Sequence, residues 1–334
     1  MRISGIDTAR FLAYCGMVLV NFRLAAKVTG TDDWPSRITD ALEGRAAALF
    51  VVLAGVGLTL GRAGKGDTLR RALLLMVLGL CNLTIFDADI LHFYALYFVA
   101  ALPFLSAPTK TLWLAILGLL CLTSGAYFLL DYEQNWDWDT LSYARFWTID
   151  GLALHSLFNG WHPVLPWFAF LLLGLWVGQL RLHRRPVQLA LVCGGALAAV
   201  LGAMPQQFVT DPDLHALLDT AMIPPGPTYV VAAGGSAVAA LGLVLIVQPV
   251  LDRLKIAAWL IAPGRMALSL YLLHILLGMG TLEELGLLQG QLSTTEIFAI
   301  SLLACTVSAG MSVLWARHFG LGPLERLMRW VAKR

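Results

Sequence analysis

Long apolar stretches recur along the whole chain and are separated by short polar segments. Each is close to twenty residues long, and at 1.5 Å per residue such a helix crosses a hydrocarbon core of about 30 Å. The ten stretches are residues 8–27, 44–62, 69–86, 89–106, 110–130, 162–180, 187–204, 228–250, 260–280 and 294–316. A membrane β-barrel would instead show shorter segments in which polar and apolar residues alternate. The pattern therefore predicts an all-α, polytopic membrane protein of about ten transmembrane helices.

Composition supports this fold class and excludes several others. Of the 334 residues, 58% are hydrophobic and only 13% are charged, whereas a soluble domain carries roughly a quarter charged residues. A soluble enzyme, a disordered chain and a nucleic-acid-binding protein are thereby excluded. The five cysteines lie in five different apolar stretches, without the spacing of a disulfide framework or a zinc site. We expect no metal and no covalently bound cofactor.

The basic residues are distributed unequally between the two sides of the predicted bundle. When alternate connections are assigned to opposite sides, sixteen of the 23 lysines and arginines, Arg2 and Arg334 among them, fall on one side. The other side receives Lys27, Arg37, Arg45 and Arg145. Because basic residues near the ends of spans stay in the cytoplasm, both termini are predicted to be cytoplasmic in a bacterial inner-membrane protein. Residues 1–316 are predicted to form a single bundle, and 317–334 an amphipathic basic tail on the cytoplasmic leaflet.

Two features between and within the spans carry further expectations. The long connection 131–161 combines acidic residues with four tryptophans, which suits a folded loop at the headgroup level. Small residues cluster at 194–196 and 232–236, and in a membrane such residues let helices approach closely.

Charged residues inside spans are costly and usually mark a functional path. At the predicted cytoplasmic side, Asp7 and Arg10 lie three residues apart and can pair on one helix face. Arg265 follows Pro263-Gly264 on the same side, where its guanidinium could bind phosphate oxygens. For both, contact with lipid headgroups is the structural alternative.

The predicted outer side gathers histidines and carboxylates. The polar residues there are Asp87, Asp89 and His92 at the turn before the fourth span, Asn159 and His162 before the sixth, Asn21 in the first span and His274 in the ninth. A carboxylate beside a histidine fixes its tautomer and stabilises the imidazolium, which suits a general base or an acyl relay. Structural histidines at helix ends are the alternative. Within this group we place His162 first as the base, with Asp89 and His92 orienting or replacing it.

Several motifs, in order along almost the whole chain, resemble one family. They are Gly5-Ile6-Asp7-Thr8-Ala9-Arg10 with Gly16 to Phe22, Leu49 to Gly57, Phe86-Asp87-Ala88-Asp89-Ile90-Leu91 with Tyr94, Asn159-Gly160-Trp161-His162-Pro163 with Pro166-Trp167, Pro263-Gly264-Arg265-Met266-Ala267-Leu268 with Tyr271 and His274, and Gly322-Pro323-Leu324-Glu325 with Arg329. The chain resembles the heparan-α-glucosaminide N-acetyltransferase-like membrane acyltransferases, closest to their bacterial YeiB-like branch. It departs from them at Phe11, where the family usually has glycine, and in loop 28–43, which has no histidine where the lysosomal enzyme carries its active one.

The resemblance implies an enzyme that transfers an acyl group, such as acetyl, from cytoplasmic acyl-CoA to an extracytoplasmic glycan or lipid-linked sugar. From their own chemistry and position we expect catalytic roles for His162, His92, Asp89, Asp87 and His274, and binding roles for Asp7, Arg10, Asn21, Asn159, Trp167, Arg265 and Tyr271. A histidine relay and a direct transfer are both open. The rival hypothesis is a small-molecule or lipid transporter, or flippase, built on the same bundle. Membrane lipid is an expected partner, nucleic acid is not, and a homodimer is one option for the oligomeric state.

Overall fold

The computed structural model describes residues 3–211, 214–215 and 218–333, so Arg2 and Arg334 lie outside the described residues. The chain divides into two compact units. The first comprises residues 1–50, 182–193 and 237–330, and the second comprises residues 51–181, 194–236 and 331–334. Four of the five boundaries between units fall inside helices, and the fifth, at 181/182, lies in the connection before α9. The four helices are α3 (Arg45–Leu60), α9 (Arg185–Ala203), α11 (Pro227–Arg253) and α16 (Pro323–Lys333).

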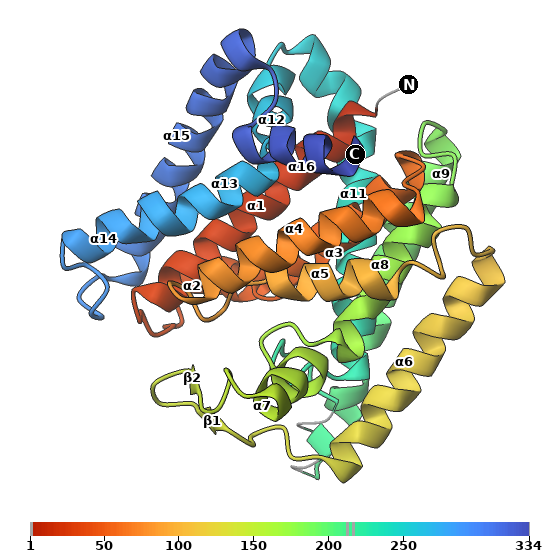
Figure 1. Ribbon diagram of the computed structural model, residues 1–334, viewed down its shortest axis with the longest axis vertical. Helices are drawn as coiled ribbons and strands as arrows, with labels where there is room; N and C mark the ends of the chain where they lie inside the picture. The colour runs from red at the N-terminus through yellow and green to blue at the C-terminus, as the bar shows by residue number, and fades with distance from the viewer. Residues whose placement is uncertain (1–2, 212–213, 216–217, 334) are drawn as a thin grey trace. The chain divides into compact units, whose positions relative to one another are not determined.

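The first unit is built around its N-terminal helix. The elements that lie wholly in this unit are α1 (Ser4–Ala25), α2 (Trp34–Leu42), α12 (Ala257–Gly264), α13 (Ala267–Leu273), a π-helical segment (His274–Met279), α14 (Gly280–Glu284) and α15 (Thr294–Phe319). Helix α1 packs against both α12 and α15 (Figure 1). The start of α16 is attached here, because the backbone N–H groups of Leu268 and Ser269 donate to Glu325 Oε1 at 2.7 and 3.0 Å.

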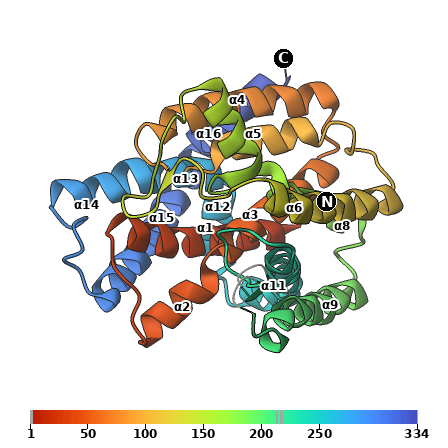
Figure 2. The ribbon, with the colours of Figure 1, turned by 90° about the horizontal axis from the view of Figure 1, so that it is seen from below.

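The second unit contains the polar loop and the helices around it. The elements that lie wholly in this unit are α4 (Lys65–Leu83), α5 (Leu91–Ala100), α6 (Thr109–Leu129), β1 (Trp136–Asp137), β2 (Ser142–Tyr143), α7 (Ile149–Leu154), a π-helical segment (His155–Asn159), α8 (Val164–Gln179) and a 3-10 turn (Pro205–Phe208). Helices α4 and α5 lie side by side (Figure 2). Helix α6 packs on α8, where the rings of Trp113 and Trp176 meet at a centroid distance of 5.1 Å.

Small residues bring α9 and α11 into backbone contact within the second unit. A Cβ atom placed on Gly235 would lie 2.5 Å from the backbone nitrogen of Ala199 and 2.6 Å from the carbonyl oxygen of Gly195. No larger residue fits at such a crossing, which is the packing that small residues allow in membranes. The close approach predicted from the clusters at 194–196 and 232–236 is confirmed.

Within the described residues, five helical segments are long and apolar enough to cross a membrane: Trp34–Leu60, Thr109–Leu129, Arg185–Phe208, Pro227–Arg253 and Thr294–Phe319. The number of candidate spans rises to seven if each of two bent helix pairs is counted as one span. The pairs are Ile149–Asn159 with Val164–Gln179, bent by 52°, and Ala257–Gly264 with Ala267–Glu284, bent by 77°. These helices confirm the all-α membrane fold. The count of ten and the side of the termini stay predictions; α5, for example, has ten residues and is only about 15 Å long at 1.5 Å per residue.

One boundary predicted from the sequence is wrong. The connection 131–161 was expected to be a polar loop up to the sixth span, but residues 149–159 are helical and turn directly into α8. Only its first half forms a loop, with a short antiparallel hairpin that pairs Trp136 with Tyr143. This helix could not be recognised from the sequence because it is only eleven residues long, polar residues interrupt its apolar positions, and its last turn is π-helical.

Candidate functional site

The turn between α4 and α5 is organised by one buried carboxylate. Asp89 accepts hydrogen bonds from Asn82 Nδ2 at 2.7 Å and from the backbone N–H of Leu91 at 2.7 Å. It also receives the N–H of His92 at 3.4 Å. The carboxylate thus satisfies N–H groups at the start of α5 that have no partner inside the helix.

His92 lies on the first turn of α5 with its imidazole next to that carboxylate. The distance from His92 Nδ1 to Asp89 Oδ2 is 3.6 Å, and both side chains are buried. Neither ring nitrogen of His92 has a hydrogen-bond partner among the described residues. The structure therefore brings together two of the residues singled out from the sequence, His92 and Asp89, with the histidine's hydrogen-bonding capacity unused.

A second histidine approaches from the π-helical segment that follows α7. His155 is the first residue of this segment, and π-turns inside helices occur frequently at functional sites. Its imidazole lies nearly parallel to that of His92, with ring centroids 6.0 Å apart and planes at 22°. The rings of Tyr143 and Phe146 cover it edge-on at 4.7 and 5.0 Å.

Asn159, the last residue of the π-turn, connects this segment to the loop before it. Its side-chain amide donates to the carbonyl oxygens of Tyr132 at 3.0 Å and Gln134 at 2.8 Å, and its Oδ1 accepts from the Tyr143 hydroxyl at 3.0 Å. The indole of Trp136 donates to its backbone carbonyl at 2.6 Å. Asn159 is fully buried, and its contacts give it a positioning role for the hairpin.

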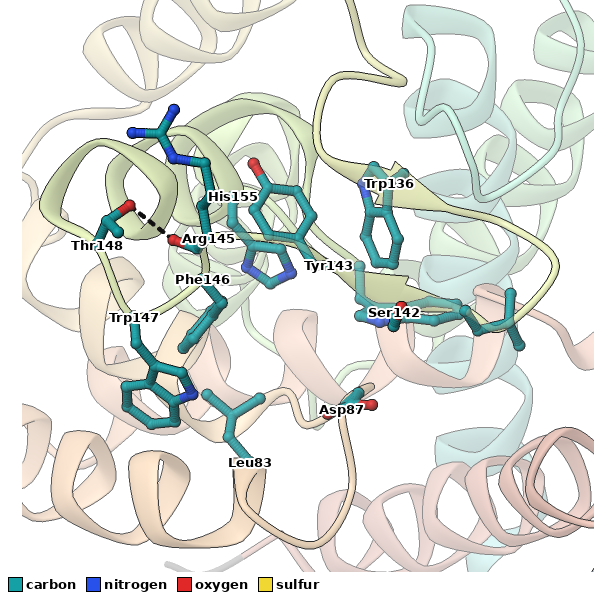
Figure 3. Close-up of a pocket in the computed structure, with 12 residues that line it drawn as sticks. Leu83, Asp87, Trp136, Ser142, Tyr143, Arg145, Phe146, Trp147, Thr148 and His155 are labelled. Carbon is teal, nitrogen blue, oxygen red and sulfur yellow. Dashed lines mark hydrogen bonds between the residues drawn. The ribbon is translucent and has the colours of Figure 1, made fainter.

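These elements enclose a cavity of about 330 Å³. Its walls are mainly aromatic, with an imidazole, a carboxylate and a guanidinium among them. The lining residues are Leu83, Asp87, Trp136, Leu141, Ser142, Tyr143, Arg145, Phe146, Trp147, Thr148, His155 and Trp161. His155 and Tyr143 lie next to each other, with Asp87 across from them (Figure 3). Asp87 is open to solvent at the mouth, yet desolvation by the surrounding protein raises the pKa of its carboxyl.

His162 occupies a different position in the second unit. Its ring packs edge-on against Trp167 at 4.6 Å and Phe93 at 5.8 Å. Its carbonyl oxygen accepts from the Tyr97 hydroxyl, and its Nδ1 has no hydrogen-bond partner among the described residues. Neither His162 nor His92 lines the cavity, whereas Trp161, the neighbour of His162, does.

His274, Asn21 and Tyr271 meet in the first unit. Asn21 Nδ2 and His274 Nε2 are 3.1 Å apart, and His274 Nδ1 contacts the carbonyl oxygen of Tyr271. These two bonds define a neutral imidazole that donates from Nδ1 and accepts at Nε2. His274 is also the first residue of a π-helical segment, as His155 is in the second unit.

Asp7, Arg10 and Arg265 are associated at another place in the first unit. Arg10 Nη1 pairs with Asp7 Oδ1 at 3.0 Å. A Cβ atom on Gly264 would lie 1.7 Å from the carbonyl oxygen of Asp7, so the end of α12 touches the first turn of α1. Arg265 follows at this contact, and its Nε is buried with no hydrogen-bond partner among the described residues.

Sequence reasoning missed His155 and the loop residues that surround it. One signal was present: His155, Asn159 and His162 have the i, i+4, i+7 spacing of one helix face. Among the described residues, no group of three or more histidine, cysteine, aspartate or glutamate side chains is arranged to hold a metal ion.

The helices and the cavity define an all-α, multi-pass membrane protein with a largely aromatic cavity next to the bent pair Ile149–Asn159 and Val164–Gln179. Residues 2–207 match the family model described as "Heparan-alpha-glucosaminide N-acetyltransferase, catalytic", and residues 174–334 match one described as "Protein of unknown function (DUF418)". The chain belongs to the heparan-alpha-glucosaminide N-acetyltransferase catalytic family, since that match covers more than half of it. The resemblance seen in the sequence motifs is confirmed, and the transporter alternative is not favoured.

One curated relative also spans the full length. The "Uncharacterized protein YxaH" of Bacillus subtilis (strain 168) is 24% identical over 390 residues, covering 98% of this chain and 93% of the relative. The cavity in the second unit lies entirely within the residues matched by the acetyltransferase family.

Proposed function

We propose that this protein is a membrane acyltransferase that moves an acetyl or similar acyl group from acyl-CoA to an extracytoplasmic glycan or lipid-linked sugar. The observation that carries the proposal is the cavity of about 330 Å³ inside the matched acetyltransferase region. Its volume is in the range of small-molecule sites, which are largely apolar with a few placed polar groups. The relative from Bacillus subtilis supports a bacterial origin, and the apolar helices support a location in a membrane.

The cavity wall suits a sugar acceptor. Trp136 and Trp138 stack at a centroid distance of 4.5 Å, and Tyr143 and Trp161 meet Trp136 edge-on at 5.2 and 5.5 Å. The electron-rich faces of such rings attract the slightly positive C–H bonds of a pyranose ring. Asp87 and Arg145 supply hydrogen-bonding groups for its hydroxyls at the same wall.

An acyl-CoA donor brings phosphates that need cationic partners. Arg265 and the Arg10–Asp7 pair supply these in the first unit, and the buried, unpartnered Nε of Arg265 is the observation that supports such a role. A guanidinium binds phosphate oxygens through two parallel charge-assisted hydrogen bonds. We propose that these residues bind the donor phosphates at the cytoplasmic side.

The experiment is an acyl-transfer assay on the purified full chain in lipid nanodiscs. Release of free CoA thiol from acetyl-CoA is followed with a panel of amino sugars, neutral sugars and lipid-linked sugars. We expect release that depends on one acceptor class, and a severalfold higher acceptor KM in Trp136→Ala. Trp113→Ala is the matched control because Trp113 packs on α8 at α6 and does not line the cavity. Absence of acceptor-dependent thiol release with every acceptor and with acetyl-, succinyl- and longer-chain acyl-CoA would refute the function.

A further inference from the structure

The side chain at the centre of the cavity wall is one that neither the motifs nor the relatives single out. Four rings surround the imidazole of His155: those of Tyr143 and Phe146, that of Phe93 at 5.5 Å and that of Trp136 at 5.8 Å. The side chain is nevertheless part of the cavity lining. His155 is therefore held in one orientation while remaining in contact with the space a ligand would occupy.

The hydrogen bonds of this imidazole are incomplete. His155 Nδ1 is buried and has no hydrogen-bond partner among the described residues. Buried polar side-chain atoms are nearly always paired in folded proteins, so an exception needs an explanation. Both ring nitrogens of the neighbouring His92 are in the same condition. Three buried imidazole nitrogens without a hydrogen-bond partner in the described part of the chain, on two adjacent rings, are costly in a purely structural core, which favours a functional role for this pair.

His155 contacts His92, and His92 in turn contacts Asp89. The two imidazoles lie 6.0 Å apart, and His92 Nδ1 is 3.6 Å from Asp89 Oδ2. Asp89 is fixed in turn by Asn82 and the N–H of Leu91. The inner imidazole of His92 thus contacts the Asp89 carboxylate on one hand and stacks on the outer imidazole of His155 on the other, and His155 lines the cavity.

Several other charged or titratable side chains lie near His155. Asp87 and Arg145 line the same cavity, and Tyr143 covers the ring of His155. His162 lies on the far side of Phe93, which contacts both histidines. Asp87 is the only carboxylate among the lining residues, and the guanidinium of Arg145 is paired with Asp150 at 2.6 Å.

We propose that His155 is the catalytic base of the acyl transfer, with His92 and Asp89 as positioning residues; this rests on the proposed function. The neutral imidazole takes the proton of the acceptor O–H or N–H while the acceptor atom attacks the thioester carbonyl carbon of acyl-CoA. Collapse of the tetrahedral intermediate breaks the C–S bond, and the imidazolium gives its proton to the departing CoA thiolate. The acceptor thereby gains the acyl group, CoA leaves as free thiol, and His155 returns to its starting state.

The first test compares His155→Ala with His183→Gln, an exposed histidine outside the cavity. We expect kcat to fall by about 10²–10⁴-fold in His155→Ala, the usual contribution of a general base, while acetyl-CoA binding changes little and the variant, though less stable because a buried ring is lost, stays folded at the assay temperature. Added imidazole should restore part of the lost rate in His155→Ala and none in Trp136→Ala. His183→Gln should behave as the wild type.

The outcomes separate this inference from the proposed function. An inactive wild type would refute the function itself. An active wild type with His155→Ala within threefold of its kcat, or a folded, inactive His155→Ala that imidazole does not rescue, would overturn the base assignment and leave the function standing.

A second measurement uses the wild-type chain, so that it does not depend on how the variant folds. Diethyl pyrocarbonate should inactivate the enzyme in proportion to carbethoxylation of His155, located by mass spectrometry, and bound acceptor should slow both. Inactivation without modification of His155 contradicts the proposal. In His92→Gln, the acid-side limb of the kcat/KM profile should shift, because the group next to the base has changed; an unshifted limb removes His92 from the positioning role.

Discussion

The imidazole of His155 rests directly on the α-carbon of Gly160: a Cβ atom there would lie 2.8 Å from Nδ1 of the ring and 2.4 Å from the carbonyl oxygen of His155. Gly160 ends the π-turn with an extended backbone. The absence of a side chain at this position therefore determines where the histidine can lie.

Gly160→Ala should displace the His155 ring and open the π-turn. We expect turnover to be lost to the same extent as in His155→Ala, with a lower thermal unfolding midpoint. Gly125→Ala in α6 is the matched control, because nothing lies within 4 Å of its Cβ position; there the change should stabilise the helix by about 0.5–1 kcal/mol. Equal behaviour of the two variants contradicts the close packing of His155 on Gly160.

The Asn82–Asp89 pair should be strongly coupled in stability. Removing one partner leaves a buried polar group unpaired, which costs about 1–3 kcal/mol. We expect Asn82→Ala and Asp89→Ala each to lower the free energy of unfolding by that amount, and the double variant to lose clearly less than the sum. Additive losses in chemical unfolding of the purified protein would show that the two side chains do not act together.

Donor binding should depend on Arg265. Loss of a charge-assisted hydrogen bond to phosphate costs about 1.5–3 kcal/mol, so Arg265→Ala should raise the acetyl-CoA Kd at least tenfold. Arg37→Ala is the control, since Arg37 pairs with Asp32 on an exposed surface. If isothermal titration calorimetry gives the same acetyl-CoA Kd for both variants, the donor phosphates do not bind at Arg265.

Acid should weaken the contact between the start of α2 and α15. Hydrogen bonds from the hydroxyls of Thr294 and Thr31, and from the N–H of Ser36, lower the pKa of Asp33 well below its usual range. A lowered folded-state pKa contributes stability above the ordinary pKa near 4, and that contribution is lost as the pH falls through the folded value. The wild type should therefore exceed Asp33→Ala in thermal midpoint at pH 7, and the difference should shrink below pH 4. A difference that is constant between pH 7 and pH 3 contradicts the assignment.

The two sides of the membrane can be assigned by cysteine labelling. In a variant without the five native cysteines, Thr140→Cys in the hairpin loop should react with an impermeant maleimide from outside. Arg184→Cys should react only after the cytoplasmic side is opened. Both positions are exposed, so burial does not affect the comparison. Labelling of both from the same side would refute the predicted topology.

The helices could be predicted from the sequence because a membrane leaves the backbone little choice. In hydrocarbon each backbone N–H and C=O must be paired within its own segment, so apolar length alone indicates a helix. The Asp89–His92 pair could also be predicted, since their spacing is local. The position of His155 could not, because it depends on a π-turn that the sequence does not signal and on ring contacts with His92 and Phe93, which lie far from it in the sequence. The backbone contact between Gly264 and Asp7 could not be predicted either, because these residues lie far apart in the sequence.

We expect helices α6 and α8 to be under different selection because they differ in burial. Most of α6 is uncovered by its own chain, with side chains such as Leu122 and Phe128 at 62% and 78% exposure, whereas α8 is buried along most of its length. Fluid hydrocarbon accepts any apolar shape, while a packed neighbour accepts few. Drift among leucine, isoleucine, valine and phenylalanine on α6 should consequently be nearly neutral. Low sequence identity across a full-length match, as with the Bacillus relative, is compatible with an unchanged fold in such a protein.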